Sequence, residues 1–540
     1  MLKITGVLSL IFFLSGNVLG QYKKDVTQPD TSQNIIHNMD IPRVRYAESI
    51  TARELKAHLD VLASADMEGR ETGTPGNDKA TDYIARYLNN LGLSPIPGTK
   101  EYKQPVAFTF SKWLKNECKI NGKSFKHLWD YLVFPSDNKG ENIKAAEILF
   151  MGYGIEDETY SDYKKTDVQG KVVLINKGEP TINDSISMIT GTTKMSAWSN
   201  GLDKKLKLAK EKGAIAVLII DNDIKKTLEE NRRKILGSFL ELGDLSQKIY
   251  EYPTHVYIST TMATEIIGKK QKKILKSRKR MAKGKGSPVS LVATLDLDLE
   301  KEIKILQSNN VIGYIEGTDK KDEYLVVSAH FDHLGKRGDD IYYGADDNGS
   351  GSSLLLELAQ SFQQAVLEGQ RPSRSIVFCW FTGEEKGLLG SKYYAEYPVF
   401  PLKSTVVNVN VDMVGRTDDK YNDKTDYTYI IGSDRLSSDL HKINEMMNQQ
   451  YTQIVLDYKY NDEADPNQFY YRSDHYNFAK NGVPAIFFFT GTHKDYHRTT
   501  DTADKILFDK MVPIGKLIFQ TTYEIANRKD RLVVDGIIKE

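Results

Sequence analysis

The chain has 540 residues, 40% of them hydrophobic and 27% charged, and its 73 basic residues balance 73 acidic ones. This composition excludes a wholly disordered chain, and the zero net charge argues against a dedicated nucleic-acid binder. The length corresponds to three or four domains of about 150 residues, or to one large domain with an insertion. Two cysteines, Cys118 and Cys379, are too few for a disulfide framework or a cysteine-rich zinc module. Histidines and carboxylates must therefore bind any metal.

The first twenty residues have the pattern of a secretory signal peptide. Lys3 precedes an apolar stretch at 4–14 and small residues at 18–20, so Gln21 is the expected start of the mature chain. An uncleaved membrane anchor is the alternative, but the apolar stretch is shorter than the ~20 residues that span a bilayer. We therefore expect an exported protein, periplasmic or extracellular.

Residues 21–45 are polar and are expected to form a flexible leader, followed by two amphipathic helices. Thr51 and Glu54 form a capping box at the start of the first helix, and leucines follow at helical spacing. The second helix follows a glycine-rich turn at 68–76 and stops at Gly92.

Between residues 111 and 290 the pattern changes to short strands, which indicates an inserted domain. The predicted elements are strands at 147–154, 171–175 and 214–220 and a helix at 206–212. The tail of this region, Gly268 to Gly286, holds ten basic residues and no acidic one. It is either a polyanion site or the solvated face of a surface helix, and the balanced charge of the whole chain favours the solvated face.

From about residue 310 onward, apolar strands alternate with helices. The predicted strands are 324–329, 375–381, 405–409 and 485–489, and the predicted helices are 352–364, 386–396 and 437–450. Fully apolar strands that alternate with helices indicate an α/β sandwich with a largely parallel sheet.

Each of these four strands is followed by a histidine, a carboxylate or both. In such sheets ligands collect beyond the carboxyl ends of the strands, so these side chains should converge. His330 and Asp332 share a face of extended chain, which lets Asp332 orient a metal-binding His330 through its other ring nitrogen. Adjacent Glu384 and Glu385 point different ways, so one can bind a metal while the other acts as a base.

This set of side chains suits two zinc ions or similar divalent ions. Two ions ~3.5–4 Å apart need a bridging carboxylate together with terminal histidines and carboxylates. Each feature alone has an ordinary explanation, such as a turn or a helix cap, but their convergence favours a metal site. The five expected ligands are His330, Asp346, Glu385, Asp412 and His497, which leaves Glu384 as the general base.

Several motifs around these residues resemble those of the M28 family of zinc metallopeptidases. In chain order they are His330-x-Asp332, Gly344–Gly351, Gly383–Ser391, Asn410–Gly415 and Tyr496–Ile506. The inserted region resembles a protease-associated (PA) domain through Gly152–Ile155, Tyr160–Tyr163 and Asp167–Leu174. The resemblance implies a three-layer α/β/α sandwich with a mixed, largely parallel sheet, formed by 46–110 and 291–540. A β-rich PA-like domain at 111–290 would interrupt it and would roof the cleft.

The resemblance also implies a role for each site residue. Asp346 would bridge the two ions, with His330 and Asp412 on one and Glu385 and His497 on the other. Glu384 would be the general base, and Asp332 would orient His330. Tyr496 would stabilise an oxyanion, unless it is ordinary packing, and Arg472 would bind substrate, unless it pairs with Asp474.

These roles lead us to expect an exported di-zinc aminopeptidase that hydrolyses peptides. The carboxylates of the site can hold a cationic free amino end. A carboxypeptidase needs several cations for a terminal carboxylate, and Arg472, Arg416 and Arg498 are the near candidates. The alternatives are a carboxypeptidase or dipeptidase, an enzyme resembling glutaminyl cyclases, and an inactive binding ectodomain.

Overall fold

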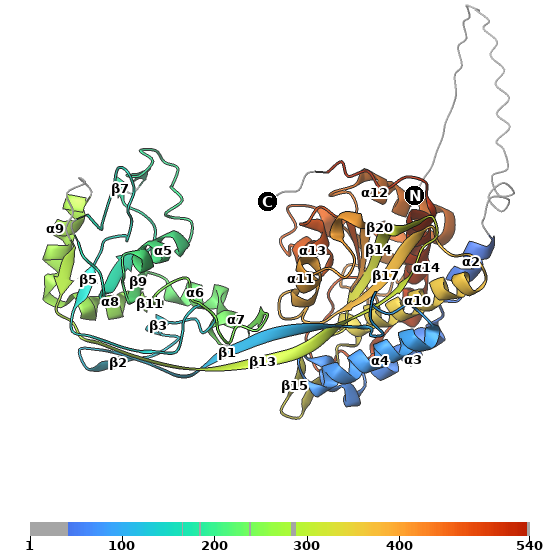
Figure 1. Ribbon diagram of the computed structural model, residues 1–540, viewed down its shortest axis with the longest axis horizontal. Helices are drawn as coiled ribbons and strands as arrows, with labels where there is room; N and C mark the ends of the chain where they lie inside the picture. Colours follow the sequence, from blue (N-terminus) through green and yellow to red (C-terminus); the bar gives the residue numbers. More distant parts are fainter. Residues whose placement is uncertain (1–40, 165, 183–184, 237–238, 282–287, 537–540) are drawn as a thin grey trace, which may run out of the picture.

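The computed structural model describes residues 41–164, 166–182, 185–236, 239–281 and 288–536. A larger α/β unit and a smaller inserted unit are joined by a long two-stranded ribbon (Figure 1). The expected signal peptide and residues 21–40 of the expected leader lie outside the described residues. Within the described ranges, no helix combines the length and apolar composition that crossing a bilayer requires.

The leader is shorter than expected, because residues 41–47 are folded. Helix α2 (Ile41–Ala47) packs against the C-terminal helix α14 (Phe508–Asn527). Arg43 is buried, and its guanidinium lies 2.9 Å from the carboxylate of Glu524. The polar stretch that we expected to be a leader as far as residue 45 therefore contains Arg43, a basic residue that anchors α2.

The large unit is built on a mixed sheet. Its main strand order is β10 (Leu240–Leu242), β1 (Lys103–Ile120), β13 (Leu295–Ile315), β17 (Arg374–Phe381), β14 (Lys320–His330), β18 (Thr405–Val411), β21 (Ala485–Phe489), β19 (Tyr427–Ile431) and β20 (Val455–Asp457). The four strands β17, β14, β18 and β21 are mutually parallel. Short strands β2 (Lys123–Phe125) and β4 (Asn142–Ala145) pair with β1 and β13, and β15 (Gly335–Arg337) forms a hairpin with β16 (Asp340–Tyr342).

Helices cover both faces of this sheet. Side chains alternate between the two faces of each buried strand, so apolar strands present side chains on both faces that must be covered. On β14, Leu325 and Val327 belong to one apolar core, whereas Val326 belongs to another. The first core is covered by α2, α3 (Ala52–Leu62), α4 (Pro75–Leu91), α10 (Gly351–Leu367), α12 (Ser438–Met447) and α14, and the second by α11 (Leu389–Glu396) and α13 (His475–Ala479). The expected three-layer α/β/α fold is confirmed.

Helices α3 and α4 are the two amphipathic helices predicted from sequence, and α3 begins and α4 ends where predicted. The Oγ1 of Thr51 accepts a hydrogen bond from the backbone N–H of Glu54 at 3.3 Å, which is the N-cap bond of the predicted capping box, while the Glu54 carboxylate accepts from the Thr51 hydroxyl at 2.7 Å rather than from its backbone N–H. Gly92 ends α4 with φ of 77°, a left-handed conformation that glycine adopts without strain.

The inserted unit has its own sheet, flanked by short helices. The strand order is β12 (Val289–Leu291), β5 (Ile148–Phe150), β6 (Val172–Asn176), β9 (Ala216–Asp221), β11 (Thr254–Ser259) and β3 (Tyr131–Leu132). The helices are α5 (Asp203–Glu211), α6 (Ile224–Glu230), α7 (Arg232–Ile235), α8 (Thr260–Ile267) and α9 (Gln271–Met281), and β7 (Thr181–Ile182) pairs with β8 (Ile186–Ser187). The described part of the basic stretch lies largely in α9, which buries Ile274 and exposes Lys272 and Lys273, as a surface helix does.

The ribbon between the two units consists of β1 and β13. They pair antiparallel from Lys103 opposite Val311 to Ile120 opposite Leu295. The near end lies in the large sheet, and Ile120 and Leu295 at the far end belong to the core of the inserted unit. The expected boundary at residue 110 therefore falls inside a continuous strand (Figure 1).

Candidate metal centre

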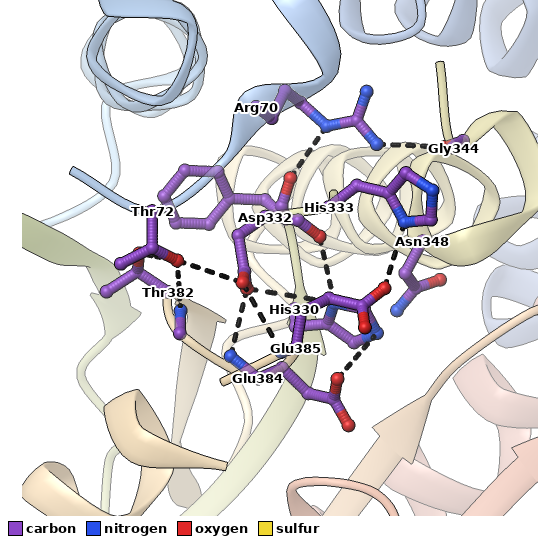
Figure 2. Close-up of polar contacts among 12 residues, drawn as sticks. Arg70, Thr72, His330, Asp332, His333, Gly344, Asn348, Thr382, Glu384 and Glu385 are labelled. Atoms are coloured by element: carbon purple, nitrogen blue, oxygen red, sulfur yellow. Dashed lines mark hydrogen bonds and ion pairs between the residues drawn. The ribbon is translucent and has the colours of Figure 1, made fainter. Parts of the chain in front are cut away.

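The site residues come from the carboxyl ends of neighbouring strands. His330 is the last residue of β14, Glu384 and Glu385 follow β17, Asp412 follows β18, and His497 lies in the loop after β21. These strands are parallel neighbours, so their ends meet at one edge of the sheet. Figure 2 shows His330, Glu384 and Glu385 gathered at this edge.

Two groups of side chains there have the spacing of metal ligands. The first contains His330, Glu384 and Asp412, with the Nε2 of His330 3.3 Å from the Oδ1 of Asp412. The second contains His333, Asp347 and Glu385, with the Oε1 of Glu385 3.0 Å from the Nδ1 of His333. His497 adjoins the second group, since its Nε2 lies 3.2 Å from the same Glu385 oxygen.

Asp347, not Asp346, connects the two groups, because it belongs to the second group and also faces His330 of the first. Its Oδ1 lies 3.5 Å from the Nε2 of His330, and its Oδ2 lies 3.0 Å from the Nε2 of His497. Asp346 turns away, since its Oδ1 accepts a hydrogen bond from the N–H of Gly415 at 2.7 Å and its Oδ2 lies 3.3 Å from His493. The prediction that Asp346 faces the cluster is wrong, because the backbone of this loop directs its neighbour inward.

The Asp332 carboxylate was predicted to orient the ring of His330, but in the structure it has other hydrogen-bond partners. Its carboxylate lies 3.8 Å from the Nδ1 of His330, too far for a hydrogen bond, and its backbone carbonyl lies 3.2 Å from that nitrogen. The carboxylate instead accepts hydrogen bonds from the N–H of Glu384 at 3.0 Å and from the hydroxyl of Thr72 at 2.9 Å (Figure 2). Asp332 thus fixes the backbone that carries the two glutamates.

The cluster concentrates negative charge in a buried place. Burial raises the pKa of Glu384 well above its ordinary value, although the charge of His330 opposes the shift. Burial also disfavours ionised Glu385, but contacts with His333 and His497 outweigh it and hold its pKa well below the usual range. Asp347 and Glu385 raise the pKa of His497 to about 10, against the opposite effect of burial. A bound cation would supply the counter-charge that these carboxylates need.

Unpartnered buried atoms point to the same conclusion. The Oε1 of Glu385, the Nε2 of His497 and the Nδ1 of His333 are buried and have no hydrogen-bond partner among the described residues. Leaving a buried polar atom unpaired costs about 1–3 kcal/mol. Imidazole nitrogens and carboxylate oxygens are also the donors that zinc prefers. The residues present therefore fit divalent metal ions.

A cleft beside the cluster has a polar wall and an apolar wall. Its lining residues are His330, Asp347, Glu384, Glu385, Asp412, Met413, Phe469, Arg472, Phe487, Phe489, Thr492 and Tyr496. The Tyr496 ring stacks on His497 with centroids 3.9 Å apart, and its hydroxyl lies 3.4 Å from a guanidinium nitrogen of Arg472. Arg472 lines the cleft and is exposed, so it lies at the mouth of the cleft. Asp474, its alternative partner in the prediction, is fully buried.

Three supporting residues and one possible ligand are absent from the set predicted from sequence. Ser473 donates to the Oδ2 of Asp412 at 2.7 Å, and Thr72 holds Asp332. Arg70 is buried and donates to four backbone carbonyls of Leu62, Phe331, Tyr343 and Gly344 around the site. The possible ligand, His333, carried a sequence signal in its spacing of three residues from His330.

Comparisons with known proteins agree with this architecture. Residues 310–522 match the model of peptidase family M28, and residues 137–270 match that of the PA domain. A probable leucine aminopeptidase of Arthroderma otae is 33% identical over 215 residues, which cover 38% of this chain and 55% of the relative. A glutamate carboxypeptidase 2 homolog of Caenorhabditis briggsae is 37% identical over 122 residues, which cover 22% of this chain and 15% of the relative.

A solved structure, the aminopeptidase from Aneurinibacillus sp. strain AM-1, is similar over 92% of this chain and 98% of its own. Its TM-score is 0.51 at 21% sequence identity, which shows a shared fold. The chain thus contains a region similar to peptidase family M28 at residues 310–522, preceded by a region similar to the PA domain at residues 137–270. The resemblance of both regions is confirmed, while the matches span only about half or less of these curated relatives.

Proposed function

We propose that this protein is an exported exopeptidase that binds two zinc ions and removes amino-terminal residues from peptides. The observation that carries the proposal is that Asp347, a member of the second group, also lies 3.5 Å from His330 of the first group, so one carboxylate adjoins both groups. The M28 domain at 310–522 supports the same chemistry. Export rests on the signal-peptide pattern of the first twenty residues.

Each ion has its own set of proposed ligands. His330, Asp347 and Asp412 would hold one ion, and Asp347, Glu385 and His497 would hold the other. When bound, such a pair of ions polarises a peptide carbonyl and lowers the pKa of water. The hydrogen bond from Ser473 would keep Asp412 oriented toward its ion.

Glu384 is the proposed general base. Its Oε2 lies 3.9 Å from the Nε2 of His330, and its backbone N–H is fixed by Asp332, so the carboxylate faces the cluster on a rigid support. It would take the proton of the attacking water and give it to the leaving amine. Burial raises its pKa above the ordinary value, which makes the carboxylate a stronger acceptor for that proton.

Tyr496 and Arg472 are proposed to act on the substrate side of the cleft. Burial raises the pKa of Tyr496, so its phenol keeps its proton at neutral pH and can donate to a developing oxyanion. Arg472 lies at the mouth, where its guanidinium can bind a carbonyl or carboxylate of the peptide beyond the scissile bond.

The cleft favours an amino end over a carboxyl end. Arg472 is the one arginine among its lining residues, whereas a terminal carboxylate is typically held by several cations. The apolar wall of Met413, Phe469, Phe487 and Phe489 suits an apolar first side chain. Leucine buries about three more carbon atoms than alanine, at ~0.8 kcal/mol each or ~2.4 kcal/mol together, so leucyl substrates should be cleaved up to about 60 times faster.

A matched pair of chromogenic leucine amides tests the proposal, one with a free amine and one acetylated. The free amine should be cleaved far faster, and Glu384→Gln should lower kcat by about 10²–10⁴ with unchanged metal content. Equal rates on both amides, or cleavage only of peptides with a free carboxyl end, would overturn the amino-end assignment. Near-normal turnover by Glu384→Gln would overturn the role of the base.

A further inference from the structure

His333 is a buried histidine that the proposed ligand set does not use. It follows His330 by three residues, just beyond β14, and its side chain is fully buried. Its Nδ1 lies 3.0 Å from the Oε1 of Glu385 and 3.7 Å from the Oδ2 of Asp347. Neither ring nitrogen has a hydrogen-bond partner among the described residues. Figure 2 shows the ring beside Glu385, on the side of the cluster away from Glu384.

The position of this ring is set by its surroundings. Gly344 lies against it, and a Cβ at that position would come within 2.4 Å of the His333 Cγ. Gly344 also has φ of 54°, in the left-handed region. The backbone N–H of His333 donates to the carbonyl of Arg70, which is itself buried among four carbonyls. The loop is therefore shaped to hold an imidazole here with one nitrogen facing two carboxylates.

We propose that His333 is a further metal ligand, binding through Nδ1 the ion that Asp347, Glu385 and His497 hold. This inference rests on the proposed function. It makes the two ion sites unequal, because one then has two imidazoles and the other only His330. A second imidazole strengthens the preference for zinc or cobalt over magnesium or manganese, so this site should fill first.

The competing role for His333 is support, with the ring donating a hydrogen bond to Glu385. The Nδ1–Oε1 distance would allow it, but the two atoms are not aligned as a hydrogen-bonded pair. The two roles differ in measurable ways. Loss of a supporting residue lowers metal affinity about 10–100-fold and leaves the number of bound imidazoles unchanged. Loss of a ligand removes one imidazole from the metal.

The test compares the wild type with His333→Phe and a matched control, His493→Gln. His493 is also a buried histidine near the site, but it faces Asp346. X-ray absorption of the two-zinc protein should count three imidazoles over two ions in the wild type and in the control, and two in His333→Phe. Chelator competition should show one site weakened more than 100-fold in His333→Phe, beyond the range of a supporting residue.

The outcomes separate this inference from the proposed function. A wild type that binds fewer than two ions overturns the proposed function. A wild type with two ions and only two imidazoles overturns the role of His333 by itself, without any variant. Unchanged affinities in His333→Phe do the same. If His333→Phe does not fold, His333→Asn takes its place, and the wild-type imidazole count still decides the question.

Discussion

The two adjacent aspartates of the loop that starts at Gly344 should behave as opposites when each is changed to asparagine. The Asp347 oxygens lie 3.5 Å from His330 and 3.0 Å from His497, so Asp347→Asn removes charge at the place shared by both proposed ion sites. Asp346→Asn keeps an oxygen that can accept from the N–H of Gly415 and gains an amide that can donate toward His493. We expect Asp347→Asn to lose bound metal and Asp346→Asn to keep it.

The size of the effect depends on whether metal is present. In metal-free protein, Asp347→Asn should be neutral or stabilising, because burial and the charge of Glu385 raise the pKa of Asp347 and make its ionised form unfavourable. With free zinc at 100 times its Kd, each bound ion adds about 2.7 kcal/mol to the free energy of unfolding, or about 5 kcal/mol for two. Asp347→Asn should lose most of that gain. Asp346→Asn should lower the free energy of unfolding by about 1–2 kcal/mol both with and without zinc, because its hydrogen bonds are altered.

Urea unfolding with zinc and with chelator measures these differences, and elemental analysis after gel filtration counts the ions. The zinc-dependent shift in midpoint should vanish in Asp347→Asn and persist in Asp346→Asn. If Asp346→Asn lost its metal while Asp347→Asn retained two ions, the geometric assignment of the bridging position would be refuted.

Three further predictions concern the frame around the site. Arg70→Met should lower the free energy of unfolding by about 3–5 kcal/mol, because four buried carbonyls lose their donor. The control, Lys56→Ala on the surface, should change it by less than about 1 kcal/mol. Similar urea midpoints for the two variants would contradict this prediction. Cys118 and Cys379 should react with a thiol reagent only after unfolding, because both are buried and burial raises the pKa of Cys118 to about 12; rapid labelling of the native protein would contradict this. Burial lowers the pKa of His475 to about 3, so between pH 6.5 and 3 the unfolded chain binds a proton that the folded chain does not, and stability falls as the pH falls. His475→Phe should reduce the slope of unfolding free energy against pH by up to ~1.4 kcal/mol per unit in that window, and an unchanged slope would count against it.

The fold is predictable from sequence where a buried strand is fully apolar and ends in a polar residue. The strands before His330, Glu384 and Asp412 have this pattern, and the rule that parallel strands end together places their side chains at one edge. Adjacent Asp346 and Asp347 cannot be told apart in this way. Their orientations depend on the dihedral angles of an irregular loop, which neither composition nor spacing specifies.

Two other features escaped prediction for physical reasons. His333 lies beyond the end of β14, where the two-residue alternation of a strand no longer says which way a side chain points. The ribbon reads as a boundary near residue 110 because part of it faces solvent and carries charged residues. Lys112, for example, lies 2.9 Å from Glu302 on the opposite strand. In the sequence alone such charged residues are typical of a loop, although in the structure they form a cross-strand contact.

The paired strands β1 and β13 restrict how the chain tolerates insertions and deletions. Both connections to the PA domain run through one ladder, so removing residues from one strand alone would leave the other without partners. A deletion of one residue in each strand would also turn every side chain beyond it to the opposite face. Lengths should therefore change in matched steps of two residues on both strands. Homologous chains with longer or shorter ribbons should differ by even numbers, and a bulge such as the one between Trp113 and Lys115 is where an odd residue can be absorbed.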